Sequence, residues 1–116
     1  MKILIVDDSL IIRNKVERFL GSEHSYEMAI DGVEALEFFN QQLPDFVTMD
    51  LTMPNMEGVQ CIGEIRKINS SVKILVISAL DDKLTALEAI KSGANGFLGK
   101  PFTEKELANA LTVLFK

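Results

Sequence analysis

Two adjacent carboxylates, Asp7 and Asp8, interrupt the apolar stretch LIVDDSLII near the start of the chain. Carboxylates at that separation repel each other, and burying an unpaired carboxylate costs free energy unless the group stays protonated. The pair therefore indicates a neutralising partner, and a divalent cation is the simplest one.

Three further polar residues each follow a short apolar run that is typical of a strand. Asp50 follows DFVTM, Ser78 follows KILVI and Lys100 follows NGFLG. Several carboxylates with room for water suit Mg²⁺, which prefers oxygen ligands and often completes its coordination with a phosphate. The same residue types suit phosphoryl transfer, in which a carboxylate is the nucleophile, a metal ion and a lysine neutralise the phosphoryl oxygens, and a hydroxyl donates to one of them. We predict Asp50 as the nucleophile because it stands alone at the end of its strand.

Each of these residues also has an ordinary structural explanation. Asp8 or Ser9 can cap a following helix while Asp7 fills a turn. Ser78 can be a turn or cap residue, and Lys100 can be a solvated surface lysine. The functional interpretation depends on all of these side chains meeting at one edge of one sheet.

The rest of the chain alternates between short strands and amphipathic helices. Predicted strands are KILIV (2–6), YEMAI (26–30), DFVTM (45–49), KILVI (73–77) and NGFLG (95–99). Apolar residues at helical spacing predict five helices, on the stripes Ile12, Val16, Phe19 and Leu20; Val33, Leu36 and Phe39; Ile62 and Ile65; Leu84, Leu87 and Ile90; and Leu107, Leu111 and Leu114. Helix boundaries are indicated by Gly21, Pro44, Gly93 and a capping box of Thr103 with Glu106.

Strict alternation of strand and helix predicts a doubly wound α/β fold, a parallel sheet with helices on both faces. The first and fourth strands are almost entirely aliphatic, as expected where both faces of a sheet are covered. In such sheets, ligands bind at the carboxyl ends of the strands. With 116 residues, 47% of them apolar, the chain suits one domain over residues 1–116.

Composition argues against several classes of function. The net charge is −5 and the basic residues are scattered, which disfavours direct binding of nucleic acid. We expect a cytoplasmic protein without membrane insertion, because no apolar run reaches the roughly 18 residues of a span and no signal peptide is evident. Cys61, the single cysteine, has no partner for a disulfide, and we interpret it as an apolar helix residue.

Four blocks, LIVDDS, TMDLTMPNMEG, ISA and GANGFLGKPF, resemble in order and spacing the signature blocks of the receiver domains of two-component response regulators. The resemblance covers essentially the whole chain. It implies a flavodoxin-like, five-stranded parallel sheet of order 2-1-3-4-5 with five helices in a three-layer sandwich, which would bring the first and third strand ends together.

The resemblance also implies a metal site and a phosphoacceptor. By this likeness Asp50 accepts the phosphoryl group, and Mg²⁺ is held by Asp7, Asp8, Asp50 and the backbone carbonyl of Thr52. Thr52 and Leu80 occupy the flanking positions at which relatives tune the lifetime of the phosphorylated state.

Three further residues are assigned to switching by the same resemblance. Lys100 pairs with the phosphate and precedes a cis peptide bond to Pro101, Ser78 is the switch hydroxyl, and Phe97 is the switch aromatic. The chain departs from common family choices at two of them, with serine at position 78 where threonine is frequent and phenylalanine at position 97 where tyrosine is frequent. Serine lacks the methyl group that restricts the rotamer of threonine, and phenylalanine offers no hydroxyl.

The implied function is a phosphorylation-dependent signalling switch that takes its phosphoryl group from a histidine kinase or phosphotransfer domain. Such a protein catalyses its own phosphorylation and dephosphorylation but acts as a signal rather than as an enzyme. Because the chain ends soon after the last predicted helix, we expect a stand-alone, chemotaxis-type regulator, either monomeric or dimeric on phosphorylation. The alternative is a receiver excised from a longer regulator.

The residues of the loop DDSL argue against two other classes of protein. An aspartate-nucleophile phosphatase needs two aspartates separated by one residue, and here they are adjacent. A flavodoxin-type electron carrier needs a loop that binds the flavin phosphate, and two carboxylates would repel it. Mg²⁺-dependent uptake of phosphate discriminates these classes from a receiver, and from an interaction domain with a vestigial pocket.

Two surfaces are predicted to contact partners. Leu10, Ile11 and Met56 are apolar residues expected in solvent near the site, either as scattered exposed residues or as a docking patch for a phosphohistidine domain. The output surface implied by the resemblance lies on the fourth helix, fifth strand and fifth helix, around Phe97, with Lys83, Ala86, Ile90, Ala110 and Val113.

Overall fold

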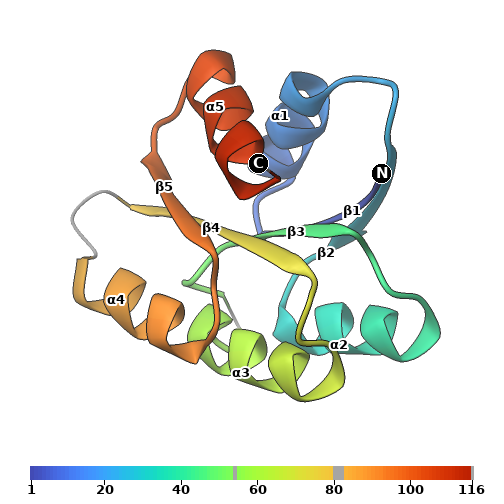
Figure 1. The fold of residues 1–116 in the computed structure, drawn as a ribbon, viewed down its shortest axis with the longest axis vertical. Coiled ribbons are helices and arrows are strands. Elements are labelled where there is room, and N and C mark those ends of the chain that lie inside the picture. The colour runs from blue at the N-terminus through green and yellow to red at the C-terminus, as the bar shows by residue number, and fades with distance from the viewer. Residues whose placement is uncertain (54, 80–82, 116) are drawn as a thin grey trace.

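The computed structural model describes residues 1–53, 55–79 and 83–115, which form one sheet flanked by helices (Figure 1). The strands are β1 (Lys2–Val6), β2 (Ser25–Ala29), β3 (Phe46–Met49), β4 (Lys73–Ala79) and β5 (Gly96–Lys100). The helices are α1 (Leu10–Leu20), α2 (Gly32–Gln41), α3 (Gly58–Ile68), α4 (Lys83–Ser92) and α5 (Glu104–Leu114). The predicted alternation of strands and helices is confirmed, with strand ends at most two residues from those expected.

All neighbouring strands pair in parallel, in the order β2-β1-β3-β4-β5. Helices α1 and α5 cover one face of the sheet, and α2, α3 and α4 cover the other (Figure 1). The doubly wound fold class and the strand order predicted from the sequence are therefore confirmed. The order reverses between β1 and β3, where ligands bind in folds of this kind.

Alternate residues of β1 supply two separate cores, one on each face of the sheet. Ile3 and Ile5 pack toward α1 and α5, whereas Leu4 and Val6 pack toward α2 and α3. Successive side chains of a strand point to opposite faces, so in a strand covered on both sides a charged residue is unfavourable until the strand ends. The first carboxylate of the chain accordingly appears one residue after β1.

Helix ends follow the local signals of the sequence. Gly21, with φ of +97°, ends α1 in a backbone conformation that favours glycine. Thr103 and Glu106 form the predicted capping box, in which each side chain accepts a hydrogen bond from the backbone N–H of the other residue. Among the described residues, no helix is long and apolar enough to cross a membrane.

The predicted buried face of α4 is wrong. Leu84, Leu87 and Ile90 are 78%, 58% and 43% exposed, and the buried residues of the helix are Ala86 and Ala89. Small side chains allow α4 to lie close against its neighbours, so its larger aliphatic residues face outward. A similar but smaller error concerns Val33, which is 42% exposed at the start of α2.

Candidate functional site

The carboxylates of Asp7, Asp8 and Asp50 converge at the carboxyl edge of the sheet. Val6 pairs with Met49 at the ends of β1 and β3, so the next residues, Asp7 and Asp50, leave the sheet side by side. One ligand oxygen from each of the three carboxylates lies within 4.8 Å of the other two. Asp7 and Asp50 are buried, whereas Asp8 is exposed and leaves one side of the cluster open. A group of hard oxygen donors with an open side fits Mg²⁺, which retains water or phosphate in part of its coordination shell.

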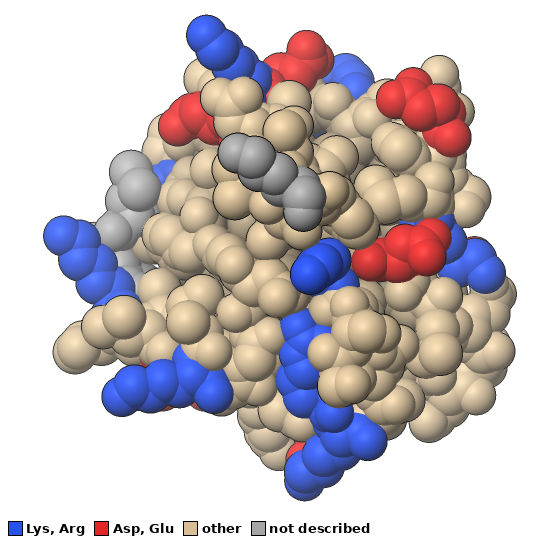
Figure 2. All heavy atoms as spheres, viewed as in Figure 1, with Lys and Arg blue, Asp and Glu red and all other residues tan. Residues whose placement is uncertain are grey.

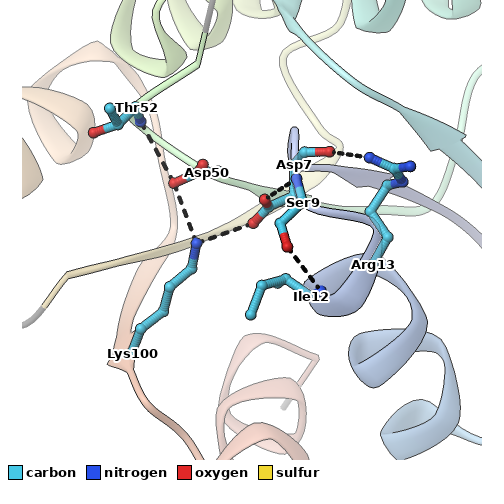
Figure 3. Close-up of polar contacts among 7 residues, drawn as sticks. All are labelled: Asp7, Ser9, Ile12, Arg13, Asp50, Thr52 and Lys100. Carbon is cyan, nitrogen blue, oxygen red and sulfur yellow. Dashed lines mark hydrogen bonds and ion pairs between the residues drawn. The ribbon is translucent and has the colours of Figure 1, made fainter.

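Asp7 is both a member of this cluster and part of the turn that starts α1 (Figure 3). Its Oδ1 accepts from the backbone N–H of Ser9 at 2.9 Å, and its backbone N–H donates to Ala29 at 3.0 Å. The Ser9 side chain in turn caps α1 by accepting from the backbone N–H of Ile12. The structural and functional explanations of this loop are therefore compatible, because the turn leaves the second carboxylate oxygen of Asp7 facing the cluster.

Lys100 reaches the cluster from the last residue of β5. Its Nζ lies 3.1 Å from Oδ2 of Asp7 and 3.6 Å from Oδ1 of Asp50 (Figure 3). The side chain is about one quarter exposed, at 26%, so it is not a solvated surface lysine. The peptide bond between Lys100 and Pro101 is cis. One ammonium thus lies against two of three carboxylates, which leaves an excess of negative charge for a cation to neutralise.

Burial, and after it the negative charge of Asp7, raise the pKa of Asp50 from 3.8 to about 6. The Lys100 ammonium and the backbone N–H of Thr52, which lies 3.4 Å from Oδ1, act in the opposite direction. The ionised form of Asp50 is therefore disfavoured at this site without a metal ion. A divalent cation among the three carboxylates would favour it.

Ser78 lies near the carboxyl end of β4, whereas Phe97 lies near the start of β5. Ser78 is buried near the end of β4, opposite Gly99 of β5, and no hydrogen bond between described residues joins its hydroxyl to the cluster. Phe97 is half-buried on β5, opposite Val76. It lines a shallow apolar groove of about 280 Å³ between β5 and α5, with Ala110, Val113 and Leu114 among the other lining residues.

The loop after β3 carries Thr52 and is tied to the start of α2. Asn55 donates from Nδ2 to Oδ2 of Asp31 at 2.6 Å, and Oδ1 of Asp31 accepts from the backbone N–H of Glu34 at 2.9 Å. The hydrogen bond from the backbone N–H of Glu34, and then that from the side-chain amide of Asn55, hold the pKa of Asp31 below its ordinary value. This link could not be predicted from the sequence, since a long-range pair of polar residues leaves no periodic signal.

Of the residues expected around the site, Met56 needs correction and Leu80 lies outside the described residues. Met56, expected in solvent, is half-buried, and a Cβ on Gly32 would lie 2.9 Å from the Met56 Cβ. Thr52 is exposed beside Asp50, whereas Leu80, the other residue expected to flank the site, lies outside the described residues.

Arg13 is a further neighbour of the cluster and was not predicted from the sequence. Its Nη1 donates to the backbone carbonyl oxygen of Asp7 at 2.6 Å (Figure 3). Its position, four residues after the N-cap Ser9, is the available signal, because a side chain one turn into a helix lies above the cap.

The chain belongs to the response regulator receiver domain family, whose model matches residues 3–112. This family consists of signalling domains that bind Mg²⁺ at an acidic pocket and interact with histidine kinases and downstream targets. Among curated proteins, the chain is 40% identical to the chemotaxis protein CheY of Thermotoga maritima, with 99% of this chain and 98% of that protein covered.

Two further comparisons show the range of proteins that contain this domain. The response regulator MprA of Mycobacterium avium is 33% identical over 100% of this chain, which covers 51% of MprA. The solved structure of the chemotaxis protein CheY4 of Vibrio cholerae superimposes with a TM-score of 0.89 at 31% identity, with 97% of each chain covered. The family therefore includes relatives of about this length and relatives in which the domain is about half of a longer protein.

Proposed function

We propose that residues 1–116 form one receiver domain that acts as a phosphorylation-dependent switch, with Asp50 as the phosphoacceptor. The observation that carries the proposal is the convergence of three carboxylates and Lys100 at the strand-order reversal. An acidic cluster with one exposed member has both the charge to hold a cation and an open side from which a phosphoryl donor can approach.

In the proposed reaction, a carboxylate oxygen of Asp50 attacks the phosphorus of a phosphohistidine. An O–P bond forms, the N–P bond breaks, and the imidazole of the donor leaves with the electron pair. Lys100, already within 3.6 Å of Asp50, neutralises charge on the transferred group. Mg²⁺ held by Asp7, Asp8, Asp50 and the carbonyl of Thr52 would supply further positive charge at the phosphoryl oxygens.

The phosphorylated state is read, in this proposal, through α4, β5 and α5. Phosphate on Asp50 adds acceptor oxygens for the hydroxyl of Ser78, and Phe97 turns into the space that Ser78 vacates. The supporting observation is that Leu84, Leu87 and Val113 expose large apolar side chains on α4 and α5. Figure 2 shows a largely uncharged area left of centre, with Lys and Arg at the left and lower edges and also near the centre of this view.

The donor is proposed to dock at the start of α1. Leu10 and Ile11 are 60% and 78% exposed beside the acidic cluster, which supports an apolar contact for a histidine kinase or phosphotransfer domain. The same switch would operate in a stand-alone regulator, as in CheY, or in a receiver that is joined to an output domain, as the coverage of MprA suggests.

Mass spectrometry after incubation with acetyl phosphate and Mg²⁺ tests the phosphoacceptor. The wild-type protein should gain one phosphate, and Asp50→Asn, which is nearly isosteric, should gain none. Labelling of the variant to the wild-type extent would assign the reaction to another carboxylate. The readout is tested by NMR with beryllofluoride and Mg²⁺, where shifts confined to the Asp50 pocket, without changes at Phe97, α4 and α5, would contradict the proposed output surface.

A further inference from the structure

Among the three carboxylates of the cluster, that of Asp8 has the fewest contacts to fix its position. Within the described residues, its carboxylate makes no hydrogen bond or ion pair, and the residue is exposed. Asp7, in contrast, is held through Oδ1 by Ser9 and through Oδ2 by Lys100. The direction in which the side chain of Asp8 points therefore depends on the conformation of its backbone.

Arg13 fixes that backbone. Its Nη1 donates to the carbonyl oxygen of Asp7 at 2.6 Å, and this carbonyl belongs to the peptide unit that joins Asp7 to Asp8. A peptide unit is planar, so a hydrogen bond to its oxygen sets the orientation of the whole plane, including the position of the next Cα. The backbone N–H of Asp7 is also fixed, by Ala29 at 3.0 Å, so the planes on both sides of Asp7 are held.

The guanidinium of Arg13 approaches from the side of Asp7 away from Lys100 (Figure 3). It donates to a carbonyl rather than to a carboxylate, so it leaves the carboxylate oxygens available for a cation. A charged donor also makes a stronger hydrogen bond to a carbonyl than a neutral one does. The Arg13 stem is anchored in α1, whose backbone N–H at this residue donates to Ser9 at 3.0 Å.

We propose that Arg13 is a positioning residue for the metal site, which aims Asp8 at the cation by orienting the Asp7–Asp8 peptide unit. The inference rests on the proposed function, because it assumes that Mg²⁺ binds at this cluster. Groups that orient metal ligands without touching the metal commonly change its affinity by 10- to 100-fold. Arg13→Met, which keeps an unbranched stem but removes the donor, should weaken Mg²⁺ binding by about tenfold.

Calorimetric titration with Mg²⁺ and NMR of the Asp8 amide test the proposal without any phosphorylation. Arg18→Met is the matched control, because it removes the same charge from the same helix at an exposed residue. We expect the control to bind Mg²⁺ within about twofold of wild type, and Arg13→Lys, which keeps a charged donor, to recover part of the affinity that Arg13→Met loses. The loss in Arg13→Met should persist at high ionic strength, where an effect of net charge would be screened.

Several results would overturn the proposal. One is wild-type affinity for Mg²⁺ in Arg13→Met. Another is a loss of affinity in Arg18→Met as large as in Arg13→Met, which would show that only the net charge matters. If the NMR spectrum shows that Arg13→Met is unfolded, Arg13→Gln takes its place and the same two outcomes apply. A wild-type protein that binds no Mg²⁺ would overturn the proposed function together with this inference, whereas normal binding by wild type and Arg13→Met alike would overturn the inference alone.

Discussion

The acidic cluster is expected to cost stability when no metal ion is present, and Asp50→Asn should relieve that cost. The folded protein raises the pKa of Asp50 from 3.8 to about 6, so near neutral pH folding must hold an ionised group where the neutral form is favoured. Each pKa unit corresponds to about 1.36 kcal/mol, which sets an upper limit of about 3 kcal/mol. Because water reaches the open side of the cluster, we expect a gain of about 1 to 3 kcal/mol in the free energy of unfolding.

The sign of the pH dependence follows from the proton balance. Between pH 3.8 and about 6, the folded protein retains the Asp50 proton while the unfolded chain has lost it, so wild-type stability falls as the pH rises through this window. Below the window Asp50 is neutral in both states, and Asp50→Asn should be as stable as wild type. The gain from the substitution should therefore grow between acid and neutral pH and stay constant above.

Thermal unfolding at acid and neutral pH, in the presence of a chelator, measures this difference. For a domain of this size, the expected gain raises the melting temperature at neutral pH by about 4 to 12 °C. Glu37→Gln, which removes an exposed carboxylate of α2, is the control and should change little. Equal or lower stability of Asp50→Asn at neutral pH without metal would refute the reasoning, since burial and repulsion would then not dominate at Asp50.

Three further predictions concern the metal, the donor and the loop after β3. Mg²⁺ should raise the melting temperature of the wild type by mass action, and less so that of Asp8→Ala; an undiminished rise in a double Asp7 and Asp8 alanine variant would exclude this metal site. Leu10→Asp and Ile11→Asp should slow phosphorylation by a cognate kinase but not by acetyl phosphate, whereas equal slowing by both would indicate damage to the site. Asn55, with φ of +68°, donates to Asp31, so Asn55→Ala should lose about 1 to 3 kcal/mol of unfolding free energy in urea titration. Asn55→Gly, which adopts that φ without strain, should lose less; the reverse order would show that backbone strain does not contribute.

The sheet could be predicted from the sequence because its signals are local. The run KILIV is apolar at every position after Lys2, and only a strand covered on both faces places such a run at low free energy. The polar residues at the strand ends were predictable for the same reason, since a charged side chain cannot lie earlier in a buried strand. The order of the strands, in contrast, came from the resemblance to a family, because alternation alone is compatible with more than one order.

The contacts that orient the site could not be predicted in this way. The hydrogen bond of Asn55 with Asp31 joins two loops that meet only after folding, and that of Arg13 with Asp7 has no sequence signal beyond the position of Arg13 one turn after the N-cap. The acceptor of the Arg13 hydrogen bond is a backbone carbonyl, which every residue has. The acceptor of the Asn55 hydrogen bond is a helix-capping carboxylate, which is common in proteins. Local patterns therefore identified the side chains with chemistry at the site and missed those that position them.

The wrong prediction of the buried face of α4 has a different origin. Apolar spacing predicted that Leu84, Leu87 and Ile90 face the core, yet Ala86 and Ala89 face it instead. A helix with large aliphatic residues in solvent leaves apolar surface that folding alone does not explain, and such patches commonly contact other molecules. Local rules fail most often where a protein departs from its most stable arrangement for the sake of function. The exposed aliphatic face of α4 is therefore a further observation in support of the proposed output surface over α4, β5 and α5.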